Sequence, residues 1–208
     1  MATPPPPVAA APAVAERTDW WAQIGRFLRL GVEHILTGYD HIAFLLALIV
    51  VAPSLREVLP IVTAFTAAHS ITLLLAAMRI VRLDARIVEP AIALSICWVA
   101  AENLFRKKAA HRWVVTFCFG LVHGFGFASV LQELIVGRTG LVVSVVSFNL
   151  GVELGQLVIF AVMLPALRLV GAVIEPRRVA FGASVAIGLL GCAWALERGL
   201  ALKLLPTF

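Results

Sequence analysis

Charged residues are scarce in this chain, where they make up only 14% of the 208 residues. Soluble domains usually have about a quarter of their residues charged, whereas here hydrophobic residues reach 61% and the mean hydropathy is +0.98. Cysteine is also rare, and the three cysteines are isolated in apolar segments without metal-ligand or disulfide spacing. These deficits exclude an ordinary soluble domain and one held together by disulfides.

What the chain has instead is a series of apolar runs of roughly 20 residues, long enough to cross the hydrocarbon core of a bilayer. Short segments of alternating polarity, which are typical of a membrane β-barrel, do not occur. The sequence therefore predicts an all-α integral membrane protein, a bundle of six transmembrane helices. The expected spans are residues 21–52, 58–80, 86–105, 113–136, 140–170 and 179–200.

The remaining parts of the chain are a short N-terminal segment and basic loops. Residues 1–19 are rich in proline and alanine and lack the basic start and apolar core of a signal peptide, so we expect a disordered tail before one domain, 20–208. The net charge of +5 comes from lysines and arginines that gather between apolar segments. Such residues anchor membrane loops against head groups, so the expected partner is the lipid bilayer and not nucleic acid.

The first predicted span carries four ionisable residues: Glu33, His34, Asp40 and His41. Each costs at least about 2.5 kcal/mol in hydrocarbon on insertion scales, which predicts a use for them. On a straight helix His34 and His41 would be about 10.5 Å apart along the axis, too far for one ion with bonds of about 2.0–2.1 Å. Either Gly38 breaks the helix, or the two histidines form successive sites along a path. Hydrogen bonding to carbonyls of neighbouring helices is the alternative without metal.

The second and fourth predicted spans add one histidine each. His69 stands among threonines, which can satisfy themselves on carbonyls of the preceding turn, so the histidine is the candidate. His123 lies among Gly120, Gly124 and Gly126. Glycines bring another helix backbone close and permit local unwinding that exposes carbonyl ligands beside a cavity. A purely structural role for both histidines stays open.

The fifth predicted span places Asn149, Glu153 and Gln156 on one helix face. A carboxylate in mid-span should face protein or water, so Glu153 is the candidate counter-charge for a cation. The alternative is a buried hydrogen-bonded network that fixes helix register. The complete set of candidate metal residues is His34, Asp40, His41, His69, His123, Asn149 and Glu153.

Three further polar residues are interpreted without a metal role. Glu102 and Asn103 lie near a basic loop, where Arg106 is a potential partner. His111 stands within that loop and is expected to be solvated, which makes it a natural control.

Five segments together resemble the HupE/UreJ family of bacterial membrane proteins. They are His34-x5-Asp40-His41, residues 65–72 with His69, residues 88–96, residues 119–127 with His123, and residues 148–156 with Asn149 and Glu153. This family is associated with hydrogenase and urease gene clusters, and some members are regarded as nickel permeases. The resemblance implies a multi-pass protein of the bacterial inner membrane, with His34, Asp40 and His41 as metal residues.

The resemblance also points to one branch of that family. The permease members carry a further histidine and a glutamate around the His-Gly of the fourth span. Here His123 stands alone and is followed by Phe-Gly-Phe at residues 125–127, which is more similar to the less characterised branch.

The favoured function is a permease for a divalent transition metal, nickel first and cobalt next, with zinc as a further ion for the same ligands. Imidazole suits these ions, and transport needs ligands that also release the ion. An intramembrane metal-dependent hydrolase or acyl-transfer enzyme is the main alternative, although no His-Glu-x-x-His or Gly-x-Ser-x-Gly motif is present. A haem-bearing or structural subunit is a third. Homo-oligomers and an upstream extracytoplasmic domain stay open as partners.

Overall fold

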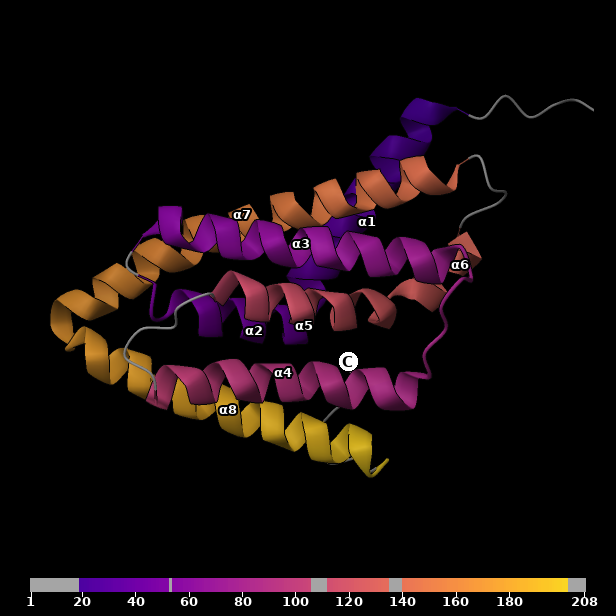
Figure 1. The fold of residues 1–208 in the computed structure, drawn as a ribbon. Coiled ribbons are helices and arrows are strands. Elements are labelled where there is room, and N and C mark those ends of the chain that lie inside the picture. The colour runs from indigo at the N-terminus through magenta and orange to yellow at the C-terminus, as the bar shows by residue number, and fades with distance from the viewer. Residues whose placement is uncertain (1–18, 53, 106–111, 135–139, 202–208) are drawn as a thin grey trace, which may run out of the picture.

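The computed structural model describes residues 19–52, 54–105, 112–134 and 140–201, and their regular structure is helical throughout (Figure 1). The all-α prediction is confirmed. The helices are α1 (Trp20–Thr37), α2 (Tyr39–Ile49), α3 (Leu55–Ala77), α4 (Ala85–Phe105), α5 (Arg112–Gly126), α6 (Ala128–Leu134), α7 (Leu141–Val173) and α8 (Pro176–Gly199).

Local sequence explains where some of these helices begin. The Asp19 carboxylate accepts hydrogen bonds from the backbone N–H groups of Trp21 and Ala22, which would otherwise lack partners in the first turn of α1. Pro176 occupies the first turn of α8, where its missing N–H costs nothing. The starts of α1 and α8 thus follow ordinary helix-terminus chemistry.

Four helices in the described residues are long and apolar enough to cross a membrane: α3, α4, α7 and α8. The pair α1 and α2, which is bent by 69°, makes a fifth if it is counted as one span. The predicted number of six is not confirmed. The expected span 113–136 is divided at Phe127 into α5, with 15 residues, and α6, with 7, each shorter than the roughly 20 residues that a span needs.

Three helix pairs make the most extensive contacts: α1 with α7, α3 with α5, and α4 with α8. Figure 1 shows α3 and α7 running side by side, α2 and α5 in the middle of the molecule, and α4 with α8 along the opposite side. Histidine rings from α1, α2, α3 and α5 lie close to one another in the interior.

Glycines set the close approach of α1 and α7. A Cβ atom at Gly31 would overlap the carbonyl oxygen of Phe148, and one at Gly151 would overlap that of Leu28. The two backbones are therefore in direct contact, as small residues permit in membrane helices.

The predicted role of the glycines in α5 is confirmed at two positions. A Cβ at Gly120 would lie 2.5 Å from the carbonyl oxygen of Phe65, and one at Gly124 would lie 2.5 Å from that of His69. This contact presses the face of α5 that carries His123 against the part of α3 that carries His69.

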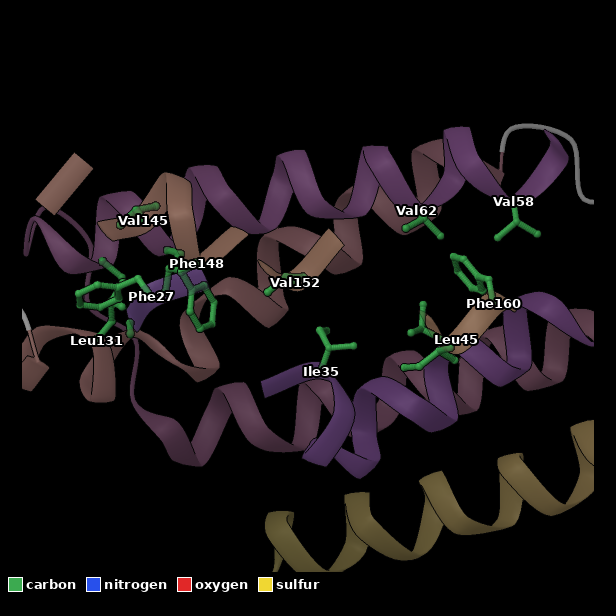
Figure 2. Close-up of a cluster of buried hydrophobic side chains, with 14 of the residues drawn as sticks. Phe27, Ile35, Leu45, Val58, Val62, Leu131, Val145, Phe148, Val152 and Phe160 are labelled. Atoms are coloured by element: carbon green, nitrogen blue, oxygen red, sulfur yellow. The ribbon is translucent and has the colours of Figure 1, made fainter. Parts of the chain in front are cut away.

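Apolar side chains both fill the interior and cover the outside. Figure 2 shows part of the larger buried cluster, in which Phe27, Ile35 and Phe148 belong to α1 and α7. On the outside, large apolar residues are widely exposed, among them Val173 at 88% and Leu169 at 72%. Extensive apolar exposure on long apolar helices fits a lipid environment.

Candidate metal centre

The break between α1 and α2 brings together two histidines that a straight helix would hold apart. Gly38 has an extended conformation, with φ −76° and ψ 96°, between the two helices. Its N–H donates to the carbonyl of His34, and its own carbonyl accepts from Ile42, each at 3.0 Å. The ring centroids of His34 and His41 are 4.6 Å apart. Of the two arrangements that the sequence allowed, the structure has the broken helix.

The third histidine comes from α3. Each of His34, His41 and His69 offers a ring nitrogen, and these three atoms lie within 4.8 Å of one another. Two nitrogens bound to one ion at about 2.1 Å are at most about 4 Å apart, so small side-chain movements would bring all three into coordination. We call these residues the three-histidine group.

Four ring nitrogens of this group have no competing partners. Nε2 of His34, Nε2 of His69 and both nitrogens of His41 are buried and make no hydrogen bond in the described structure. Buried polar atoms in proteins are nearly always paired. Their convergence without partners therefore fits the binding of a metal ion.

Asn149 of α7 holds His69 in position. Its side-chain N–H donates to the carbonyl of Val145 at 2.9 Å, which turns its carbonyl oxygen towards Nδ1 of His69, 3.1 Å away. This arrangement places the imidazole proton on Nδ1 and leaves the lone pair of Nε2 free for an ion. Asn149, a predicted metal residue, thus lies directly behind a histidine of the group.

His123 of α5 lies next to the group, with its ring centroid 5.5 Å from that of His41. Its Nε2 is 2.9 Å from Oγ of Ser95, and that hydroxyl donates to the carbonyl of Ile92 at 2.6 Å. The hydroxyl oxygen can then accept from Nε2, so the lone pair is on Nδ1, which is buried without a partner. His123 offers one further nitrogen ligand beside the group.

The two predicted carboxylates are outside the three-histidine group. Asp40 forms two hydrogen bonds with Arg198 at the end of α8, at 2.9 and 3.1 Å. Glu153 is half-buried on α7, one turn from Asn149, and has no hydrogen bond or ion pair with the described residues. The pairing of Asp40 with Arg198 was missed in the sequence analysis, because Arg198 lies at the end of the last predicted span and was read as structural.

Aromatic rings surround the three-histidine group. The ring centroid of Phe127, at the break between α5 and α6, lies 4.5 Å from that of His34, and the Phe127 ring stacks on Phe148 with 4.8 Å between centroids. On another side, the ring centroids of Phe44 and Phe65 lie 5.3 and 5.1 Å from the ring centroid of His123. An apolar shell of this kind controls solvent access and strengthens electrostatic interactions inside it.

A cavity of about 400 Å³ lies at the end of α3 and the start of α4. Phe125, Gly126 and Ala128, the residues around Phe127, line one side of it, and the polar residues Arg79, Arg82 and Glu89 line others. The segment that carries Phe127 thus lies between this cavity and His34.

A separate buried network connects α4 and α5 away from the histidines. Glu102 pairs with Arg112 at 3.4 Å, and Arg112 donates to the side-chain carbonyl of Asn103 at 2.5 Å. Arg112 is thus a partner of Glu102 and Asn103 that the sequence did not suggest. Arg106 and His111 lie outside the described residues.

A family model described as HupE / UreJ protein matches residues 10–198. The chain belongs to the HupE/UreJ family. The match includes every candidate metal residue, and the resemblance read from the five sequence segments is confirmed. Curated proteins and solved structures gave no match. HupE/UreJ membership, the apolar helices and the three-histidine group together indicate a membrane protein that handles a transition metal.

Proposed function

We propose that this HupE/UreJ protein is a permease for a divalent transition metal, with nickel favoured and cobalt next, and that His34, His41 and His69 bind the ion inside the bilayer. The observation that carries the proposal is the convergence of three imidazoles, each of which has a buried ring nitrogen without a partner. Imidazole ligands suit nickel, cobalt and zinc better than magnesium or calcium. The association of the family with nickel and cobalt transport supports the same reading.

The composition of the site favours passage over permanent retention. The three-histidine group includes no carboxylate and supplies three neutral ligands, so an ion keeps open coordination positions. Transport requires binding strong enough for entry and weak enough for release. His123, beside His41, is the next ligand on the proposed path.

The other candidates have supporting roles in this proposal. Asn149 orients His69, and Glu153 on the same helix provides negative charge near the path. For the bilayer topology we propose six spans in the bacterial inner membrane, with α1 and α2 forming one bent span and α5 with α6 another. The apolar residues on both sides of Gly38 and of Phe127 support a count of six spans.

A metal-dependent hydrolase of the membrane is the second candidate. Catalytic zinc sites have three protein ligands and keep the fourth position for water, and the three-histidine group has the same number of imidazoles. In this case the ion would be zinc that stays bound and activates water.

The deciding experiment is uptake of Ni²⁺ and Co²⁺ into liposomes that contain the purified full chain. We expect saturable uptake that is abolished in His41→Ala and His69→Ala and unchanged in His111→Ala. Absence of uptake by correctly inserted protein would contradict the permease. Zinc that survives chelator washing of such protein would favour the hydrolase.

A further inference from the structure

Asp40 and Arg198 form a paired contact next to the proposed ion site. Asp40 lies in the first turn of α2 and directly precedes His41. Its Oδ2 and Oδ1 accept from the two terminal nitrogens of Arg198 at 2.9 and 3.1 Å. Such two-pronged contacts between guanidinium and carboxylate are among the stronger hydrogen-bonded pairs in proteins.

The surroundings of this pair hold it in place. The side chains of Arg198 and Asp40 are only 25% and 20% exposed, so water and salt screen the pair less than one on the surface. The guanidinium also lies 5.7 Å from the ring centroid of Trp194, one turn earlier in α8. Both charges of the pair are therefore engaged with each other, and the net charge that it adds beside His41 is zero.

This pairing determines which ligand types an entering ion meets. With Asp40 engaged, the three-histidine group offers nitrogen atoms alone. Nickel, cobalt and zinc bind well to imidazole, whereas manganese and magnesium prefer carboxylate, carbonyl and water oxygens. A free carboxylate next to His41 would add both an oxygen ligand type and a negative charge.

We propose that Arg198 is a specificity-determining residue: by pairing with Asp40 it withholds that carboxylate from the ion and so favours metals that accept nitrogen ligands. This inference rests on the proposed function, because it assumes that the three-histidine group binds the transported ion. It assigns Arg198 a role through Asp40 and no contact with the ion.

The competing explanation is that the Asp40–Arg198 pair only stabilises the packing of α8 on α2. In that case loss of Arg198 would lower stability or weaken all metals by the same factor. The ratio of affinities for two metals separates the two explanations, because a uniform loss leaves the ratio unchanged.

The test is calorimetric titration of the purified full chain in detergent with Ni²⁺ and with Mn²⁺. In Arg198→Gln we expect Mn²⁺ affinity to rise at least tenfold relative to Ni²⁺. In the double variant Asp40→Asn with Arg198→Gln the ratio should return to that of the unaltered protein, because the freed carboxylate is gone. Arg178→Gln, which removes an exposed pair with Glu175 in the first turn of the same helix, should keep the original ratio.

Two results would overturn the proposal. One is an unchanged Mn²⁺ to Ni²⁺ ratio in Arg198→Gln, and the other is a raised ratio that persists in the double variant. If Arg198→Gln does not fold, Arg198→Met replaces it, because a methionine side chain can still pack against Trp194 but cannot pair with Asp40, and an unchanged ratio there is equally decisive. Unaltered protein that binds neither metal would instead contradict the proposed function.

Discussion

The imidazole rings of His34 and His41 lie 4.6 Å apart although they are seven positions apart in the sequence, because the chain bends by 69° at Gly38. The bend brings into one candidate site two histidines that a straight helix would separate along its axis. A Cβ atom at Gly38 would lie 2.7 Å from Nδ1 of His41 and equally close to the carbonyl oxygen of His34. The histidine pair therefore depends on a residue that has no side chain.

Replacement of Gly38 by alanine should weaken metal binding. The added methyl group forces the His41 ring away from His34, and we expect Ni²⁺ affinity to fall roughly tenfold or more, the scale seen when a metal ligand loses its support. Calorimetric titration measures this loss. Gly25→Ala in α1 is the matched control, because its Cβ would meet nothing within 4 Å. Unaltered affinity in Gly38→Ala would show that the close pairing does not matter for binding.

Removal of the Asn149 side chain should affect the ion through His69. Asn149→Ala loses the acceptor for Nδ1–H, so the ring and its proton are no longer fixed, and we expect affinity for Ni²⁺ to fall about 10–100-fold. Asn149→Asp keeps an acceptor and should lose less. Titration of both variants, with the exposed Leu150→Ala as control, checks the order. Equal losses in the two Asn149 variants would contradict a role through the hydrogen bond.

The pair between Glu102 and Arg112 should matter for stability and not for the ion. Their side chains are 6% and 13% exposed, and loss of one partner from a buried pair costs about 3–5 kcal/mol. We expect Arg112→Ala to lower the free energy of unfolding by about 3 kcal/mol, measured by denaturant titration in detergent. Ni²⁺ affinity should stay unchanged, because three turns of α5 separate Arg112 from His123.

Arg178→Ala provides the comparison for that measurement. Its pair with Glu175 is highly exposed, at 80% and 58%, and exposed pairs contribute little. If both arginine variants lose the same stability, burial of the Glu102 pair is not what makes it stabilising.

Two cysteines from different helices should form a disulfide when an oxidant is supplied. Sγ of Cys97 in α4 lies 3.4 Å from Sγ of Cys192 in α8. Diamide would accept two electrons and two protons from the two thiols as the S–S bond forms. Peptide mass mapping should show this cross-link, and Cys118 should stay reduced. Absence of the Cys97–Cys192 cross-link from oxidised protein would contradict the packing of α4 on α8.

The helical fold was predictable because every helix is part of a long apolar run. The breaks inside the first and fourth predicted spans do not follow from hydropathy, because it averages over a window and does not register a break. Residues on both sides of Phe127 are apolar, and so are most of those after Gly38. Each break therefore reads as the middle of one continuous span.

The candidate site was predictable in its residues but not in its pairings. His34, His41 and His69 were chosen because ionisable residues are costly in hydrocarbon, and the structure brings them together. By contrast, Asp40 and Arg198 are 158 positions apart, and Cys97 and Cys192 are 95 apart. Contacts over such separations leave no periodic pattern in one sequence, so only the packing of α8 reveals them.

The length of α7 has a consequence for the bilayer around the protein. With 33 residues the helix is about 50 Å long, whereas the hydrocarbon layer is about 30 Å thick. Tilting alone within the usual range of up to about 40° does not absorb that excess. One end of α7 must therefore enter the head-group layer or distort it. The segment after Pro165, which carries Arg168, is suited to this, since a long cationic side chain can reach lipid phosphates from below the surface. Local membrane thickness thus becomes a variable that acts directly on the helix that holds Asn149.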